Sequence, residues 1–305
     1  MGRQQNLRVV DPVLTNIAHG YTNADFVGGA LFPMVPVPKE GGKIPKFGKE
    51  QFKVNATERA LRAQSNRILP EDRTADDYNL TEHDLEYPID YREEDEDIFP
   101  LQEHGTMVVQ EGIGLRHEKK SADLVQNNAN FPAGNKIALS GTDQFTDAAS
   151  DPLGVVEDGK DAIRQKIVKM PNTMIIGPST YKALRFHPKL LEAIKYTSLG
   201  KVTLEILREL FEIETILVGR AVYADADGVV QDIWLDNMIL AYVPAANMRS
   251  RYEPSYGYTL QRGGFPEVAT YDENGGKVQI VRSTDRFQVK ILGADAGYLI
   301  ENTNA

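Results

Sequence analysis

The chain has 305 residues and a mass of 33.9 kDa, which is enough for one large domain or for two of ordinary size. Its content of 41% hydrophobic and 26% charged residues is typical of a folded soluble protein, and its net charge of −10 excludes a protein that grips nucleic acid mainly through a broad basic surface. The absence of cysteine excludes disulfides, zinc ribbons, iron–sulfur clusters and thiol catalysis.

Residues 1–38 show little hydrophobic periodicity. The run ALFPMVPVP at 30–38 contains three prolines, which disfavour a helix and favour an extended path. Because the apolar side chains of such a path need another surface to cover them, we expect these residues to form a docking arm.

Residues 39–91 have β character but few apolar residues. The stretch GGKIPKFGKEQFKVN at 41–55 predicts two short strands around Gly48 and Lys49, with Phe52 and Val54 alternating with polar residues. A segment of this length that is too polar to build a core of its own is expected to lie on another surface.

Residues 98–128 predict one long helix. Leu101, Val108, Leu115 and Ala122 repeat every seven residues, and Pro100 suits a first turn. Three glycines, at 105, 112 and 114, each cost about 1 kcal/mol in a helix interior. They would also let another element approach the helix closely.

Residues 150–305 carry an α/β pattern. Val156, Ile163 and Ile167 predict a helical stripe, TMIIG at 173–177 predicts a buried strand, and helices follow at 178–195 (interrupted by Pro188) and 203–211 (capped by Thr203). Strands are then expected at 214–225, 233–243, 256–261, 277–283 and 286–292, with a DADG turn at 225–228.

The chain offers little catalytic or metal-binding chemistry. The acidic run at 90–97 has no histidine cluster beside it and is typical of a solvated face, while Asp225 and Asp227 lack the glutamate that a calcium loop requires. No paired-histidine motif, phosphate-binding loop, dinucleotide loop or nucleophile elbow occurs, and Trp234 is expected in a core or an interface. We therefore expect no enzyme activity, no cofactor and no metal.

Targeting signals are equally scarce. The N-terminus has no apolar segment of signal-peptide length, and the longest apolar stretch, at 238–246, is about half as long as a membrane span. A cytoplasmic protein without a membrane segment is expected.

Four stretches resemble, in sequence and in order, the major capsid proteins of tailed bacteriophages with the Hong Kong 97 fold. They are NKIALSGTDQFTDAASDPLGVV (135–156), PNTMIIGPSTYKALRFHPKLLEAIKY (171–196), VTLEILRELFEIETILVGRAVY (202–223) and IWLDNMILAYVP (233–244). The similarity covers most of the chain and is weakest at 39–91.

The resemblance implies an α+β fold with five segments. They are an N-terminal arm (1–38), an extended β-hairpin loop that reaches over a neighbouring subunit (39–91), a peripheral domain with the spine helix (92–149), an α/β axial domain (150–250), and C-terminal strands that return to the peripheral domain (251–305). Since the arm begins almost at Met1, any scaffold is expected to be a separate protein.

By the same resemblance, the protein is expected to be a structural head protein that self-assembles, as pentamers and hexamers, into an icosahedral shell around packaged double-stranded DNA. Separate scaffold and portal proteins, and decoration proteins, would be its partners; DNA would be contacted weakly; and assembly would take place in the bacterial host cytoplasm before the protein becomes part of the virion. Two alternatives stay open: a nanocompartment shell of the same fold around protein cargo, and a cytoplasmic α/β enzyme with its site in residues 150–250.

The charges are unevenly distributed and indicate a contact between subunits. Residues 39–62 hold seven basic and three acidic residues, a net charge of +4, whereas residues 67–104 hold 14 acidic residues and three arginines, a net charge of −11. We expect the basic loop of one subunit to lie against an acidic surface of the next. The candidate contact residues are Lys43, Lys46, Lys49, Lys53, Asp90, Glu93, Glu94 and Asp95.

Overall fold

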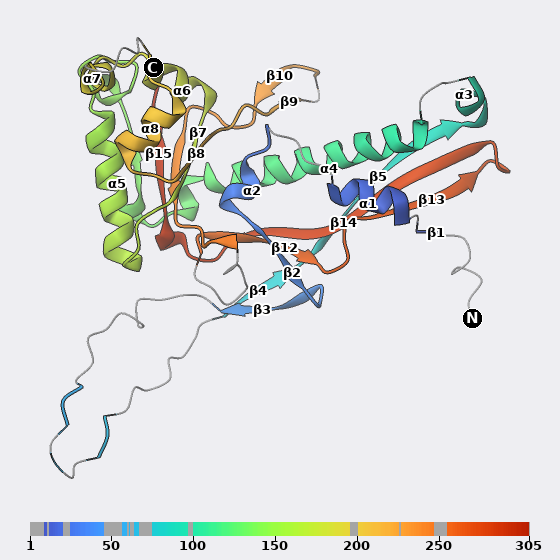
Figure 1. Cartoon of the computed structure of the whole chain (residues 1–305), viewed down its shortest axis with the longest axis horizontal. Helices are drawn as coiled ribbons and strands as arrows, with labels where there is room; N and C mark the ends of the chain where they lie inside the picture. The colour runs from blue at the N-terminus through green and yellow to red at the C-terminus, as the bar shows by residue number, and fades with distance from the viewer. Residues whose placement is uncertain are drawn as a thin grey trace.

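The computed structural model describes residues 9–10, 12–20, 25–45, 57–59, 61, 64–66, 75–96, 100–195, 201–225, 227–246 and 255–304. A compact region around a five-stranded sheet continues into an elongated region, in which a six-stranded sheet lies along one long helix (Figure 1). None of the helices in these residues is long and apolar enough to cross a membrane.

The six-stranded sheet is built mainly from the C-terminal part of the chain. Its strands are β1 (Val9–Val10), β2 (Met34–Val37), β5 (Thr81–Asp90), β12 (Gly257–Arg262), β13 (Glu267–Glu273) and β14 (Val278–Ile291). β13 and then β12 pair with one edge of β14, and β5 pairs antiparallel with the other edge. The two strands expected at 277–283 and 286–292 are therefore one continuous strand, and β13 was not expected.

The long helix α4 (Leu101–Val125) confirms the helix expected at 98–128, with Pro100 as its N-cap. The seven-residue repeat does not define its buried face, because Val108 is 41% exposed. The buried positions include Thr106, Val109 and Ile113. This face is set by the sheet beneath the helix, which a pattern of large apolar residues does not reveal.

The N-terminal arm contains more helix than expected. α1 (Pro12–Gly20) packs against α4 and β13, and the hydroxyl of Thr15 both accepts from the backbone N–H of Val268 and donates to its carbonyl oxygen. A second, four-residue helix α2 (Gly28–Leu31) precedes the prolines, which then hold β2 in the expected extended path. The arm docks on its own subunit through these elements.

The segment that follows the arm is anchored by two strands. β3 (Gly41–Pro45) pairs antiparallel with β4 (Ala75–Asn79), so the partner of β3 is not the stretch at 51–54, which lies outside the described residues. Ile44, Tyr78 and Leu80 are buried against Val35 and other residues of the six-stranded sheet region. The expectation that this polar segment lies on another surface is thus confirmed for its base.

The five-stranded sheet contains strands from distant parts of the chain. In spatial order they are β6 (Lys136–Ala138), β15 (Gly297–Glu301), β11 (Met238–Ala241), β7 (Thr173–Ile176) and β8 (Thr215–Val218). Every residue of β7 and β11 is buried, because both faces of the sheet are covered, and this explains their unbroken apolar sequences. β15 was not expected from the sequence.

Four helices cover one face of this sheet. They are α5 (Pro152–Ile167), α6 (Pro178–Arg185), α7 (Pro188–Ala193) and α8 (Leu204–Phe211). Pro188 separates α6 from α7 as expected, and the hydroxyl of Thr203 accepts a hydrogen bond from the N–H of Ile206 at 3.5 Å, as a helix cap does.

The remaining elements are short. They are α3 (Tyr91–Glu96), the two-stranded hairpin of β9 (Val222–Ala224) and β10 (Val230–Asp232), and 3-10 helices at Asn128–Asn130, Ala133–Asn135, Gly141–Asp143 and Ala294–Ala296. Asp225, Asp227 and Gly228 lie in the turn between β9 and β10, as expected.

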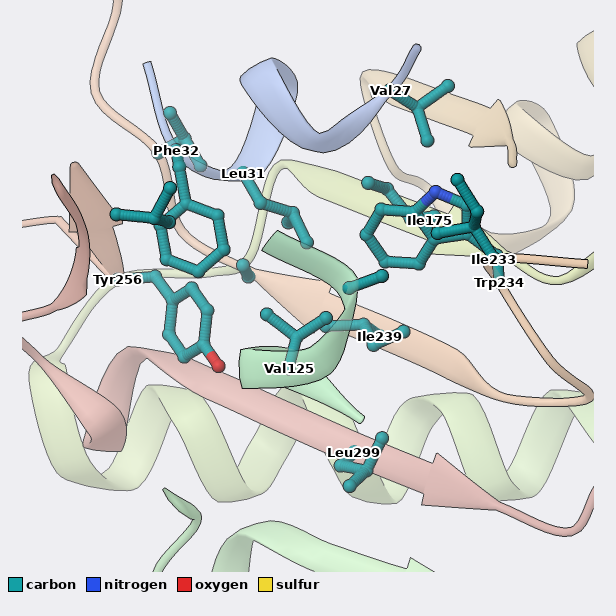
Figure 2. Packing of buried hydrophobic residues seen from close by; sticks show 14 of the residues in the cluster. Val27, Leu31, Phe32, Val125, Ile175, Ile233, Trp234, Ile239, Tyr256 and Leu299 are labelled. Atoms are coloured by element: carbon teal, nitrogen blue, oxygen red, sulfur yellow. The ribbon is translucent and has the colours of Figure 1, made fainter. Parts of the chain in front are cut away.

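The largest hydrophobic cluster lies where the two sheets and α4 meet (Figure 2). Phe32 of the arm faces Tyr256 with a ring-centroid distance of 5.7 Å, and Val125 at the end of α4 lies in the same cluster. Ile239 and Leu299 contribute from the five-stranded sheet. The compact and elongated regions therefore share one core.

Candidate assembly surfaces

One face of the six-stranded sheet is closed by α4, and glycines make the close approach possible. A Cβ on Gly105 would lie 2.8 Å from Cδ1 of Tyr87, and a Cβ on Gly112 would lie 2.7 Å from Cδ1 of Leu85. Both distances are shorter than a Cβ tolerates. Gly105 is needed because it meets the Tyr87 ring, whereas the end of the exposed Leu85 side chain could move away from a side chain at position 112. The expectation that the helix glycines admit another element is confirmed, and that element is β5.

A buried carboxylate joins the arm, the long helix and the region of the five-stranded sheet. Glu118 of α4 is fully buried, and its carboxylate accepts hydrogen bonds from the backbone N–H groups of Val27 at 2.9 Å and Gly28 at 2.8 Å. It also accepts a hydrogen bond of 2.6 Å from the indole N–H of Trp234, which is a core residue as expected. Burial raises the pKa of Glu118, and the three hydrogen bonds oppose that shift.

Two neutral histidines lie between α4 and the sheet. His83 of β5 stacks on Phe287 with a centroid distance of 4.2 Å, and its Nε2 accepts a hydrogen bond of 2.9 Å from the Lys120 ammonium. His117 of α4 is hydrogen-bonded through Nε2 to the hydroxyl of Thr259 at 2.7 Å. Burial, with the nearby charge of Lys120, lowers the pKa of His83 to about 4. Burial also lowers the pKa of His117 to about 4.

The other face of the same sheet carries a ladder of opposite charges. Residues directly opposite each other on β5 and β14 share a face, and the pairs Glu82–Arg286 and Glu86–Arg282 follow this register. Arg286 lies 2.6 Å from carboxylate oxygens of both Glu82 and Glu40, and Arg282 lies 3.8 Å from Glu86. We call these five residues the charge ladder.

The charge ladder changes the interpretation of the acidic stretch at 67–104. The sequence suggested that contacts between subunits absorb its charge, but part of that charge is paired within the subunit by arginines of β14. α3, by contrast, presents the exposed acids Glu93 and Glu94.

The structure places the candidate contact residues as follows. The side chains of Lys43, Glu93 and Glu94 are exposed, that of Asp90 is half-buried, Asp95 lies in α3 with its side chain outside the described residues, and Lys46, Lys49 and Lys53 lie outside the described residues altogether.

The acidic candidates are gathered at one end of the molecule. The carboxylate of Asp90 accepts a hydrogen bond from the N–H of Arg92 at 3.0 Å, and that of Glu93 accepts one from the N–H of Asp90 at 3.2 Å. Lys43 lies on β3, which is distant from α3 in Figure 1. Lys43, the one basic candidate within the described residues, is therefore not brought next to the acidic candidates of its own chain.

The described part of residues 150–250, where the alternative of an α/β enzyme places its site, contains the pair Ser150 and His187, which is internal. Oγ of Ser150 and Nε2 of His187 lie 2.9 Å apart, and the Ser150 hydroxyl donates to the backbone carbonyl of Asp147 at 2.9 Å. Ser150 and His187 are only 3% and 2% exposed. They fasten the turn before α5 to the junction of α6 and α7, and a substrate could not reach them.

A groove of about 440 Å³ lies between the arm, α4 and the six-stranded sheet. Phe26, Met34 and Phe265 line its apolar wall, while Gln110 and Asp285 lie at its polar side. Gln110 is hydrogen-bonded to Ser283 and Asp285 to Gln261. Within the described residues, no group of three or more histidine, aspartate or glutamate side chains could hold a metal ion.

Sequence reasoning missed Glu118 and the arginines of the charge ladder. The signal for the ladder was present, since Glu82, Asp84 and Glu86 alternate along one strand and Arg282 and Arg286 lie four residues apart on another. Glu118 gave no local signal, because its partners are 91 and 116 residues away.

The chain is similar to known proteins over its whole length. The model of the family described as phage major capsid protein E matches residues 31–256. A major capsid protein of Burkholderia phage BcepMu is 57% identical over 307 residues, which cover 100% of both chains.

Solved structures show the same similarity. A phage-related protein from Bordetella bronchiseptica RB50 superposes with a TM-score of 0.84 at 36% identity, covering 97% of this chain and 98% of that one. The capsid protein of Cyanophage P-SCSP1u shares the fold, with a TM-score of 0.57 at 9% identity over 89% of this chain and 86% of that one.

Proposed function

Because the chain belongs to the phage major capsid protein E family, it is a structural protein of the phage capsid shell, and we propose that its copies form the pentamers and hexamers of an icosahedral shell around double-stranded DNA. The full-length similarity to the major capsid protein of phage BcepMu supports this proposal. The fold is the Hong Kong 97-like α+β fold expected from the sequence. Phage capsid relatives favour this function over that of a nanocompartment shell.

We also propose partner proteins and a cellular site for assembly. Assembly takes place in the bacterial host cytoplasm with separate scaffold and portal proteins. DNA is contacted weakly, which agrees with a net charge of −10.

The contact between subunits pairs the basic loop of one copy with the acidic end of the next. Lys43, Lys46, Lys49 and Lys53 face Asp90, Glu93, Glu94 and Asp95. Two observations support this pairing: Lys43 and α3 are exposed at distant places on one chain, and acids of the neighbouring β5 are already paired with β14. Each exposed pair contributes only about 0–1 kcal/mol, so the effect depends on many copies.

Charge reversal tests this contact. Changing Lys46, Lys49 and Lys53 together to glutamate should abolish assembly at ordinary salt while the subunit stays folded by circular dichroism. The matched variant with arginine at the same three positions keeps the charge and should assemble normally. Normal assembly of the glutamate variant would refute the electrostatic part of the proposal.

Electron microscopy of the purified protein, expressed with its scaffold partner, tests the function itself. Closed shells of uniform diameter are expected. Purified protein that stays monomeric or dimeric under all conditions would contradict the proposal. Shells isolated from infected cells that contain a protein cargo in place of DNA would favour a nanocompartment.

A further inference from the structure

The β9–β10 hairpin has two chemically different faces. In its register Val230 lies opposite Ala224, and Asp232 lies opposite Val222. Residues opposite each other in an antiparallel pair share a face, and alternate residues along a strand do so too. One face therefore carries Val222, Ala224, Val230 and Asp232, and the other carries Tyr223 and Gln231.

The polar face is the one that points toward the molecule. The ammonium of Lys119 on α4 lies 5.0 Å from the centre of the Tyr223 ring, and the Tyr223 hydroxyl donates a hydrogen bond of 3.0 Å to Gln231. Tyr223 also packs against the main hydrophobic cluster. The valine face consequently points outward.

This outward face is apolar and bordered by acids. Val222 is 47% exposed and Val230 is 66% exposed. Asp227 and Asp232 are exposed beside them, while the Asp225 carboxylate is turned inward and accepts a backbone N–H of the turn, that of Asp227, at 3.0 Å. Branched apolar side chains held outward on a two-stranded hairpin are typical of a surface that another protein covers.

A second surface has the complementary composition. Phe186, between α6 and α7, is 58% exposed, and the Arg185 guanidinium lies 5.6 Å from the centre of its ring. Lys182 is exposed and Lys189 is partly exposed next to them. We call Lys182, Arg185, Phe186 and Lys189 the α6–α7 corner, which is apolar and basic where the hairpin is apolar and acidic.

Figure 1 shows the α6–α7 corner and the β9–β10 hairpin on different sides of the five-stranded sheet. We propose that the hairpin of one copy docks on the α6–α7 corner of the next copy in a capsomer. Such a contact uses two different surfaces, so each copy docks its hairpin on one neighbour and binds the hairpin of the other neighbour at its α6–α7 corner. Repeated by rotation, it closes into a ring, which the proposed pentamers and hexamers require. The inference rests on the proposed assembly and specifies one contact within it.

Engineered cysteines test the contact directly, because the natural chain has none. In shells of the F186C/V230C variant, mild oxidation should link neighbouring copies when the two Cα atoms approach within about 7 Å. Non-reducing electrophoresis should then show a ladder from dimers upward to whole rings. Shells mixed from the two single variants should yield dimers only.

Control variants distinguish a failure of the docking proposal from a failure of the proposed shell function. F186C/V13C, which uses another exposed site, should give no ladder. Shells of F186C/V230C without a ladder, or dimers formed by V230C alone, would overturn the docking proposal and leave the shell function standing. Absence of shells from the unaltered chain would instead overturn the function.

Charge reversal decides the matter if the cysteine variant folds but does not assemble. K182E/K189E should lower the yield of shells at least tenfold, and adding D227K/D232K should restore most of it. Reversal of both surfaces without restoration, in protein that stays folded by circular dichroism, would overturn the proposal.

Discussion

Replacing Glu118 with glutamine should weaken the joint between the arm, the long helix and the core. The carboxylate accepts three hydrogen bonds, from Val27, Gly28 and Trp234, and both of its oxygens are used. In the amide, one oxygen becomes an NH₂ group that must face a backbone N–H. At least one charge-assisted hydrogen bond is lost and one buried donor is left unsatisfied.

The expected loss of folding stability follows from the lost hydrogen bond and from the removal of the buried charge. A hydrogen bond to a charged group contributes about 1.5–3 kcal/mol, and removing the buried charge returns part of its desolvation cost, so we expect E118Q to destabilise the subunit by about 2 kcal/mol. For a chain of 305 residues that lowers Tm by about 3 °C. E118A, which leaves all three donors without a partner, should cost about 3–5 kcal/mol.

The assay is urea unfolding of the unassembled subunit, followed by tryptophan fluorescence. Trp234 is the only tryptophan and donates directly to Glu118, so its emission reports on this joint. E103Q, at an exposed position of the same helix, is the matched control and should change the free energy of unfolding by less than about 0.5 kcal/mol. A loss below about 0.5 kcal/mol for E118Q, with unchanged emission, would refute the reasoning.

Three further predictions concern pH, packing and charge. The folded subunit holds His117 neutral with a pKa of about 4, while the unfolded chain takes up the proton near pH 6.5. The contribution of His117 to stability should therefore be present above pH 6.5 and fall by at most about 3 kcal/mol as the pH drops to 4. Urea unfolding of H117Q across this range should lack that part of the pH dependence. G177A should fail to fold or lose more than about 3 kcal/mol, because a Cβ there would overlap the carbonyl oxygen of Leu235, whereas G29A, with nothing within 4 Å, should unfold at a temperature within about 2 °C of the natural chain. R286A should cost about 1 kcal/mol in dilute buffer and less in 1 M salt, and equal costs in both would show that the charge ladder does not act electrostatically.

Elements with strong local signals were predictable from the sequence. Thr203 caps α8, Pro188 separates two helices, and the apolar run at 173–176 is a strand buried on both faces. Each depends on residues within a few positions of one another, where turn chemistry and periodicity act directly.

What could not be predicted depends on distant partners. β3 pairs with a strand more than 30 residues away, α1 is held by β13 and α4, and Val108 is exposed because the face of α4 is chosen by the sheet beneath it. The same holds for the candidate contacts, since the pairing of Arg286 with Glu82 follows only from the register of β14 with β5.

A cryo-electron microscopy reconstruction of the assembled shell tests the central claim most directly. We predict fivefold and sixfold rings of this chain, with the five-stranded sheet and its helices toward the axes and the region of α4 and β14 toward the rim. Two results would contradict this prediction: a shell whose fivefold and sixfold rings are formed by a different protein, or purified protein that forms no closed particle with its scaffold partner.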